Sequence, residues 1–220
     1  MSREGTSSCP NSLGECPHLS ELNALKAENQ RLQELVRTDV LTGLFNRRHL
    51  NYCLDQELER TCRSGQATTL LIVDIDHFKS VNDNYGHLVG DKALQLLAAT
   101  IKNTVRKLDI ACRYGGEEFA IILPASTNAI GARVAERLRK NVENNTLTLD
   151  DVSELKITIS IGIATSSKGQ NLAPKQLISS ADEQLYKAKE SGRNRVCGEQ
   201  DNHSETEVSA EEKAALFGPS

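Results

Sequence analysis

The segment RYGGEEFAIILP, residues 113–124, limits the fold of this chain more than any other stretch. Gly115 and Gly116 separate two short apolar runs, a pattern that predicts a tight β-hairpin. Glu117 and Glu118 are expected at the tip of that hairpin, and the apolar residues after them return into a core. Because hairpin tips usually carry solvated polar residues, these two carboxylates alone do not indicate a site.

A second apolar run also ends in carboxylates. Residues 67–74 predict a buried strand, and Asp74 and Asp76 lie at its end, in LLIVDIDHFK. Proteins bind hard divalent cations with carboxylate oxygens that different parts of the chain bring together. Two buried strands with acidic ends therefore predict a metal site, and such a metal favours chemistry on phosphates.

The remaining pattern predicts an α/β domain. Asn46 is expected to cap a helix that runs to about residue 63, and Thr42-Gly43 predicts a turn before it. The other expected elements are helices over residues 88–107, 128–144 and 174–190, a strand over 156–165 and a short last strand over 194–197. The order β-α-β-β-α-β predicts a sheet with antiparallel pairs and helices packed against it.

Residues 19–37 predict a stalk helix in front of this domain. Its inner positions follow a heptad repeat made of Leu22, Leu25, Asn29, Leu32 and Val36. Apolar residues at this spacing, with one inner asparagine, predict a parallel two-stranded coiled coil and hence a homodimer through the N-terminal helix. Since two to three heptads are short for a coil, a single amphipathic helix packed on its own domain is the alternative.

Both ends of the chain differ in composition from its centre. Residues 1–18 are rich in Ser, Gly, Pro and Asn, which predicts a disordered leader. Cys9, Cys16 and His18 lie there, but their loose spacing favours the leader over a zinc site. The tail over residues 199–220 is acidic, and a capping pair within it predicts a short helix over residues 210–217.

Charge and hydropathy argue against several partners. The chain has a net charge of −4, and the tail alone carries six carboxylates and one lysine, so the rest is close to neutral. That balance does not favour a long nucleic acid as partner. No apolar run approaches the ~20 residues of a membrane helix, so no membrane insertion is expected. Scattered cysteines, among them Cys53, Cys62 and Cys112 inside helix or strand patterns, predict reduced thiols that act as small apolar side chains in a cytoplasmic protein.

Four segments together resemble the signature segments of the GGDEF family. They are DVLTGLFNRR, VDIDHFKSVNDNYGHLVGD, GGEEF and ADEQLYKAKESGRNRV, in the family's order, and the resemblance covers residues 38–196. Members of the family are diguanylate cyclases, which join two GTP into cyclic di-GMP and release pyrophosphate. The resemblance implies a palm-like α/β fold, shared with adenylyl cyclases and polymerases, whose central, mostly antiparallel sheet is flanked by helices.

The resemblance also implies a metal site. Asp74, the Ile75 carbonyl and Glu117 match the family's ligands for Mg²⁺ or Mn²⁺. Glu118 matches a position that the family requires, with metal-linked electrostatics as the expected role and proton acceptance as the alternative. Asp76 is expected to cap the following turn rather than to bind metal.

Residues 77–91 match the family's nucleotide contacts. The backbone at His77, Phe78 and Lys79 is expected to face phosphate oxygens, and His77 departs from the Phe that many family members carry. Asn82 and Asp91 match the pair that reads guanine, whose N1–H and N2–H₂ donors suit a carboxylate. The alternative for Asp91 is a helix N-cap next to a glycine.

Two basic positions near the end of the domain match phosphate contacts. Lys189 and Arg193 are implied to bind the β- and γ-phosphates, whereas their positions alone predict only cations that complement a helix dipole. Arg106 and Asp109 have the form RxxD, which matches the family's inhibitory site for cyclic di-GMP. An ordinary surface Arg–Asp pair is the alternative there.

The sequence thus predicts a cytoplasmic diguanylate cyclase that acts as a homodimer, with GTP as substrate and cyclic di-GMP as inhibitor. A regulatory protein that binds the stalk is the expected source of control. The alternative from another class is a non-catalytic module that binds GTP or cyclic di-GMP and signals through contacts. Such degenerate modules usually lose the GG-acid-acid signature, which this chain retains.

Overall fold

The computed structural model describes residues 20–28, 37–148, 154–170 and 172–198. The chain divides into two units, Met1–Arg37 and Thr38–Ser220. In the first unit, residues 20–28 are helical, and Leu22 and Leu25 of the predicted heptad are 43% and 63% exposed. Residues 29–36, the leader, its zinc alternative and the tail with its predicted helix lie outside the described residues.

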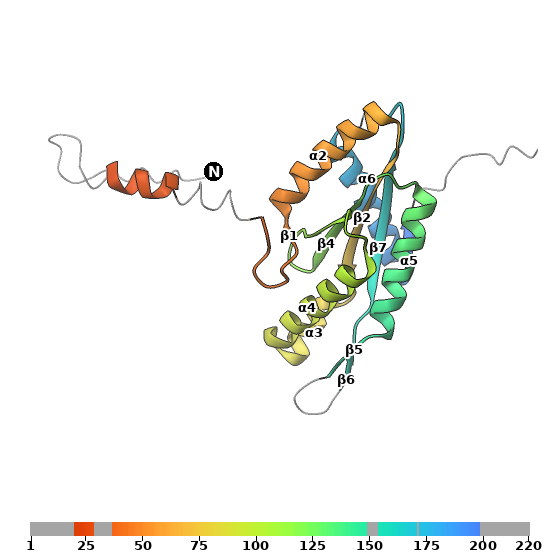
Figure 1. Ribbon diagram of the computed structural model, residues 1–220. Helices are drawn as coiled ribbons and strands as arrows, with labels where there is room; N and C mark the ends of the chain where they lie inside the picture. Colours follow the sequence, from red (N-terminus) through yellow and green to blue (C-terminus); the bar gives the residue numbers. More distant parts are fainter. Residues whose placement is uncertain (1–19, 29–36, 149–153, 171, 199–220) are drawn as a thin grey trace, which may run out of the picture. The chain divides into compact units, whose positions relative to one another are not determined.

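The second unit is built on a six-stranded sheet with the order β1-β3-β4-β2-β7-β8 (Figure 1). Its strands are β1 (Phe45–Asn46), β2 (Thr68–Ile75), β3 (Ile110–Arg113), β4 (Glu118–Leu123), β7 (Ile159–Ser166) and β8 (Val196–Gly198). The four central strands pair antiparallel, and the two edge strands pair parallel to their neighbours. The mostly antiparallel sheet predicted from the sequence is therefore confirmed. A separate two-stranded sheet pairs β5 (Thr146–Thr148) with β6 (Glu154–Lys156).

Helices cover both faces of the six-stranded sheet (Figure 1). They are α2 (Arg47–Ser64), α3 (Phe78–Tyr85), α4 (His87–Thr104), α5 (Asn128–Asn144) and α6 (Pro174–Glu190). One core cluster joins alternate residues of β2, β4 and β7 to α3, α4 and α5, and the other joins the opposite face of these strands to α2 and α6. Strand side chains alternate between faces, so each strand contributes to both clusters.

Local signals explain where the helices begin and how closely they pack. The Asn46 side chain accepts a hydrogen bond from the His49 N–H at 3.0 Å and caps α2 as predicted. Pro174 begins α6, where its missing N–H costs nothing. Gly162 of β7 lets α6 lie directly on the sheet, because a Cβ at that position would be 2.9 Å from Leu185 Cα. Close contact between α6 and β7 matters because both contribute to the site below.

Several predicted bounds differ from the structure. The helices over residues 128–144 and 174–190 are confirmed, whereas the helix predicted over residues 88–107 is α4, which starts at His87 and ends at Thr104. The strand predicted over residues 156–165 is split, since Lys156 closes β6 and β7 starts only at Ile159. The alternating isoleucines begin at Ile157, between the two strands, and run on into β7, so the hydrophobic pattern alone does not mark the break.

Cys112 behaves as the small apolar side chain that the sequence predicted, whereas Cys62 does not. Cys112 is buried in β3, where desolvation raises the pKa of its thiol to about 12, so it behaves as an apolar side chain. Cys62 is exposed on α2, so the prediction that it acts as a small core residue is wrong. Within the described residues, no helix is both long and apolar enough to cross a membrane.

Candidate active site

Alternation along two strands places two acidic side chains on one face of the sheet. Leu70 and Ile72 of β2 contact the cluster under α2 and α6, so Asp74, two residues further, points to the same face. In β4, Ala120 and Ile122 belong to that cluster, and Glu118 precedes them at the same spacing. The antiparallel register pairs Asp74 directly with Glu118, so the carboxylates come from facing positions on neighbouring strands.

Asp74 is a buried carboxylate with a cationic partner. It is only 6% exposed, and its Oδ2 lies 2.9 Å from the Lys189 Nζ of α6. Burial, opposed by Lys189 and assisted by the charges of Glu117 and Glu118, raises the pKa of Asp74 to about 6. Within the described residues no group of three acidic, histidine or cysteine side chains is arranged to hold a metal ion, so a divalent cation here would need a backbone carbonyl beside fewer carboxylates.

The hairpin tip consists of Gly116 and Glu117. Tyr114 and Gly115 N–H groups donate to the Glu118 carbonyl at 2.8 and 3.2 Å, so Glu118 is the first residue of β4. The prediction that both glutamates lie at the tip is therefore wrong for Glu118. Glu117 lies in the turn, half-buried, and its carboxylate makes no hydrogen bond or ion pair with any residue that the structure describes.

Arg113 stabilises this turn through contacts with Gly116 and Asp39. Its Nε and Nη2 donate to the Gly116 carbonyl at 3.1 and 2.9 Å, and its Nη1 lies 3.4 Å from Asp39 Oδ2. Asp39 also accepts hydrogen bonds from the Thr42 N–H and hydroxyl at 2.9 and 2.6 Å. The turn that carries Glu117 is thus fastened to the start of the second unit.

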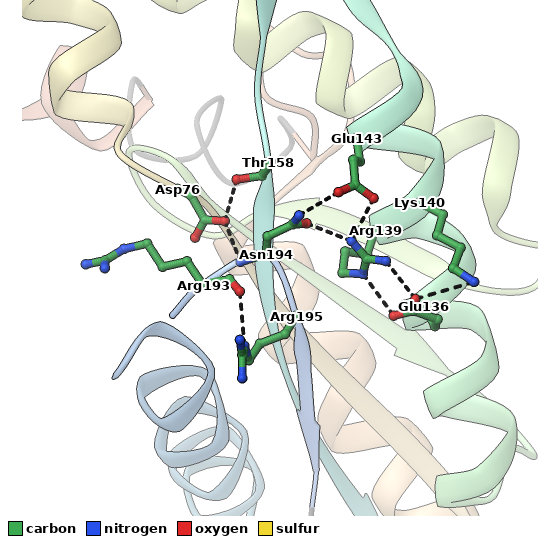
Figure 2. A network of polar contacts seen from close by, with 9 residues as sticks. All are labelled: Asp76, Glu136, Arg139, Lys140, Glu143, Thr158, Arg193, Asn194 and Arg195. Carbon is green, nitrogen blue, oxygen red and sulfur yellow. Dashed lines mark hydrogen bonds and ion pairs between the residues drawn. The ribbon is translucent and has the colours of Figure 1, made fainter. Parts of the chain in front are cut away.

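Asp76 has a structural role different from the one predicted. Its carboxylate accepts from the Thr158 hydroxyl at 2.8 Å and the Asn194 N–H at 3.0 Å (Figure 2). It also accepts from the Ser160 hydroxyl at 2.6 Å. The cap residue of α3 is His77, and no side chain caps that helix. The prediction that Asp76 caps the following turn is therefore wrong, because its oxygens are used by β7 and by the loop after α6.

The start of α3 presents backbone rather than side chains. His77 is exposed in the left-handed region, with φ 56°. The Phe78 ring is buried in the core cluster under α3, α4 and α5, so only its backbone is available to a ligand. Lys79 is exposed beside it. No side chain that the structure describes caps the first turn of α3.

Asn82 and Asp91 lie where α3 and α4 meet. The Asn82 Oδ1 rests on Gly90, in space that the Cβ of any other residue would occupy. Asp91 follows Gly90 and is exposed. Because α4 begins at His87, Asp91 lies inside the helix, and the alternative that it is the N-cap is wrong. The need for Gly90 was not predicted from the sequence. The structure shows that a glycine is needed there because the Asn82 side chain fills the space of a Cβ.

Arg193 lies beyond the end of α6 on a left-handed turn. Its φ is 62° and that of Asn194 is 45°. The Arg193 N–H donates to the Ala188 carbonyl at 3.0 Å, and in Figure 2 the side chain extends away from the polar network around Asn194. Within the described residues the guanidinium has no hydrogen bond or ion pair, so it is available to an anion, as is the ammonium group of Lys189 once Asp74 has another partner.

Arg106 and Asp109 form a compact turn on another surface. The Arg106 N–H donates to Asp109 Oδ2 at 2.7 Å, and the Asp109 N–H donates to the Arg106 carbonyl at 3.0 Å. Among the described residues, no ion pair of 4.0 Å or less joins the Arg106 guanidinium to Asp109, so the two residues pair through the Arg106 backbone. Desolvation raises the pKa of Asp109, while Arg106 and Arg137 of α5 lower it. Arg137 is therefore a further cation at this surface, and no sequence spacing indicated it.

Comparisons with known proteins agree with this geometry. The family model described as "Diguanylate cyclase, GGDEF domain" matches residues 36–195. The response regulator PleD of Caulobacter vibrioides is 43% identical over 166 residues, which cover 75% of this chain and 36% of that relative. The chain thus spans about a third of that relative's length.

Two solved structures have a similar fold. The coiled coil and GGDEF domain of DgcB from Caulobacter crescentus, in complex with c-di-GMP, has a TM-score of 0.71 and 32% identity over 83% of this chain and 95% of that chain. The diguanylate cyclase SiaD from Pseudomonas aeruginosa, in complex with its activator SiaC, has a TM-score of 0.71 and 34% identity over 83% and 70% of the two chains. Sequence, sheet order and these relatives show that this chain belongs to the GGDEF domain family.

Proposed function

We propose that this protein is a diguanylate cyclase, which condenses two GTP into cyclic di-GMP and releases two pyrophosphates. The observation that carries the proposal is the juxtaposition of Asp74 and Glu118 on paired strands, with Glu117 in the adjoining turn and Lys189 at 2.9 Å from Asp74. Clustered carboxylates beside a cation fit a site for a metal-bound triphosphate. The family membership and the name of SiaD support the same reaction.

Each residue has a proposed part in that reaction. Asp74, the Ile75 carbonyl and Glu117 would hold Mg²⁺ or Mn²⁺, which supplies charge neutralisation at the phosphates and orients them. Glu118 adds negative charge beside this site, where it strengthens cation binding. The backbone from His77 to Lys79, together with Lys189 and Arg193, binds the phosphates, and Asn82 and Asp91 bind guanine.

The proposed reaction needs two copies of the domain. Each copy presents one GTP, and the 3′-hydroxyl of one nucleotide attacks the α-phosphate of the other across a twofold axis. Since GTP is made inside cells, the proposed place of action is the cytoplasm. A protein that binds the stalk and orients the two domains is the proposed means of control, and the complex of SiaD with its activator supports such a partner.

Product analysis tests the proposal directly. The purified chain incubated with GTP and Mg²⁺ is expected to form cyclic di-GMP, identified by mass, and to form no cyclic product from ATP. Chelation of the metal is expected to stop the reaction. Binding of GTP or cyclic di-GMP without any product would reject the cyclase and favour the non-catalytic receptor.

Asp91→Asn is expected to weaken recognition of guanine. The amide replaces two acceptors with one donor and one acceptor, so one guanine donor loses its partner. The KM for GTP is expected to rise by about tenfold or more, with an unchanged melting temperature because Asp91 is exposed. Asp83→Asn, the same change at an exposed position of α3, is the matched control. An unaltered KM for Asp91→Asn would remove Asp91 from the site.

Arg106→Ala is expected to weaken product inhibition. The guanidinium offers paired donors to a phosphate or a guanine edge, and alanine offers none. The cyclic di-GMP concentration that halves the rate is expected to rise by about tenfold or more. Lys107→Ala changes the neighbouring exposed cation and serves as control. Equal sensitivity of Arg106→Ala and the unmodified protein would place the inhibitory contact elsewhere.

Removal of residues 1–36 is expected to make the rate depend on protein concentration. The stalk would raise the local concentration of one domain around the other, and its short repeat predicts an adjustable dimer. The shortened chain should be monomeric at low concentration, with a rate per molecule that rises with concentration. Full activity at every concentration would show that the domains associate without the stalk.

A matched pair of substitutions tests the inner heptad positions of the stalk helix in the full chain. Leu25 lies at an inner heptad position and Ala27 at an outer one. Leu25→Glu is therefore expected to reproduce the concentration dependence, whereas Ala27→Glu should leave the dimer intact. Sedimentation and initial rates measured at the same protein concentrations provide the comparison.

A further inference from the structure

We propose that Asn194 is a positioning residue, which sets the orientation of the phosphate-binding Arg193 by fastening the loop after α6 to β2, β7 and α5. The inference rests on the proposed function, because Arg193 matters through its contact with GTP. Asn194 itself makes no hydrogen bond with Asp74, Glu117 or Glu118, and its side-chain partners, Arg139 and Glu143, are not assigned to the nucleotide. It therefore acts through its neighbour rather than on the substrate.

The backbone of Asn194 links the loop to the strand that carries the metal ligands. Its N–H donates to Asp76 Oδ2 at 3.0 Å, and Asp76 also accepts from Thr158 (Figure 2). The Ser160 hydroxyl of β7 donates to the same carboxylate. Asp76 is buried and lies two residues after Asp74. One carboxylate thus fixes the loop, the start of β7 and the end of β2 relative to one another.

The side chain of Asn194 links the same loop to α5. Its Nδ2 donates to Glu143 Oε1 at 2.7 Å, and its Oδ1 accepts from Arg139 Nη1 at 2.8 Å. Arg139 is only 12% exposed and also pairs with Glu136 and Glu143 at 2.8 and 2.9 Å. Hydrogen bonds to these two carboxylates raise the pKa of Arg139, so the guanidinium remains charged.

Only an amide satisfies both partners of this contact. An aspartate would accept from Arg139 but would place a carboxylate against Glu143, and a glycine would provide neither bond. The left-handed backbone at Asn194 suits asparagine and glycine alike. Asn194→Gly therefore removes the side-chain contacts and preserves the backbone conformation, which isolates the role of the amide.

Loss of the Asn194 side chain leaves the remaining network intact. Arg139 retains both carboxylate partners, and Asp76 retains its two hydroxyl donors. The fold should therefore persist, while the turn at Arg193 and Asn194 gains freedom. A guanidinium on a freer turn binds the triphosphate less well, because ordering that turn then costs entropy on binding.

A double-mutant cycle on the full chain tests the proposal. GTP binding is measured by calorimetry with Ca²⁺ as the divalent cation, and cyclase rates are measured with Mg²⁺. Asn194→Gly is expected to raise the GTP dissociation constant by about tenfold, and to have almost no effect when Arg193 is already alanine. Lys140→Gln, which removes a 3.7 Å ion pair to Glu136 without touching Asn194, is the control.

Two outcomes would show that Asn194 only stabilises the fold and does not position Arg193. A lower melting temperature with an unchanged dissociation constant would overturn the proposal, and so would additive effects of Asn194→Gly and Arg193→Ala. If Asn194→Gly does not fold, Glu143→Gln alters the same amide contact and is expected to weaken GTP binding in the same non-additive way. If the unmodified protein binds GTP but forms no product, the cyclase function fails while the binding cycle still tests Asn194.

Discussion

Glu117→Gln is expected to reduce the rate of cyclic di-GMP formation by more than ~10²-fold while the fold is retained. The substitution removes a formal charge from the hairpin turn at nearly constant volume. Glu117 has no hydrogen bond or ion pair with another described residue, so the change breaks no internal contact within that part of the chain. The loss should therefore appear in activity and cation binding, with little change in melting temperature.

The control for this experiment is Glu59→Gln, which makes the same chemical change at an exposed position of α2. Glu59 makes only a 3.6 Å surface pair with Arg63, and such pairs contribute little to stability. Initial rates over a series of Mg²⁺ concentrations provide the measurement. Activity of Glu117→Gln within a few fold of the unmodified protein would reject the assignment of Glu117 as a metal ligand.

The sheet and two of its helices were predictable because their signals are local. Continuous apolar runs indicated β2 and β4, and helical patterns over residues 128–144 and 174–190 indicated α5 and α6. The end of β6 was not predictable, because isoleucines continue across the interval between β6 and β7. Pairing partners in space decide that break, and a linear pattern does not contain them.

The site was predictable where motif residues act through their own side chains. Asp74 and Glu118 pair across neighbouring strands, and Asn82 of α3 lies against Gly90 of α4, the residue before Asp91. The role of Asp76 was not predictable, because its partners lie on β7 and on the loop after α6, more than eighty residues away in sequence. Arg137 was missed for the same reason, since its guanidinium contacts the Thr104 carbonyl of another helix. The ion pair of Arg113 was missed because its partner, Asp39, lies far away in sequence.

Lys189 contacts the Asp74 carboxylate and is proposed to bind the triphosphate, so its loss is expected to reduce activity strongly. In the structure its ammonium group lies 2.9 Å from the buried Asp74 carboxylate. Burial is the largest cause that raises the pKa of Asp74, and Lys189 is the residue that lowers it. The resulting pKa of Asp74 is about 6. In the proposed reaction the same ammonium group turns to the triphosphate while the metal takes its place at Asp74.

Lys189→Met is therefore expected to lower kcat/KM for GTP on the order of 10²-fold, because the triphosphate loses a cation in a partly dehydrated site. In the protein without metal or nucleotide, the pKa of Asp74 should rise above its present value, since burial and Glu117 then act unopposed. A folded-state pKa raised above the unfolded value makes charged Asp74 costly, so the variant should lose stability as the pH rises through that pKa.

Kinetics measures the expected fall in kcat/KM, and NMR titration of the carboxyl groups measures the expected rise in the pKa of Asp74. Lys187→Met is the matched control, because Lys187 lies in the same last turn of α6 and is exposed. That control should retain the rate and leave the Asp74 titration unchanged. An unchanged Asp74 pKa in Lys189→Met would contradict the ion pair. An unchanged kcat/KM would remove Lys189 from the phosphate site. A cation that binds the triphosphate cannot be lost without weakening the transition state that it stabilises.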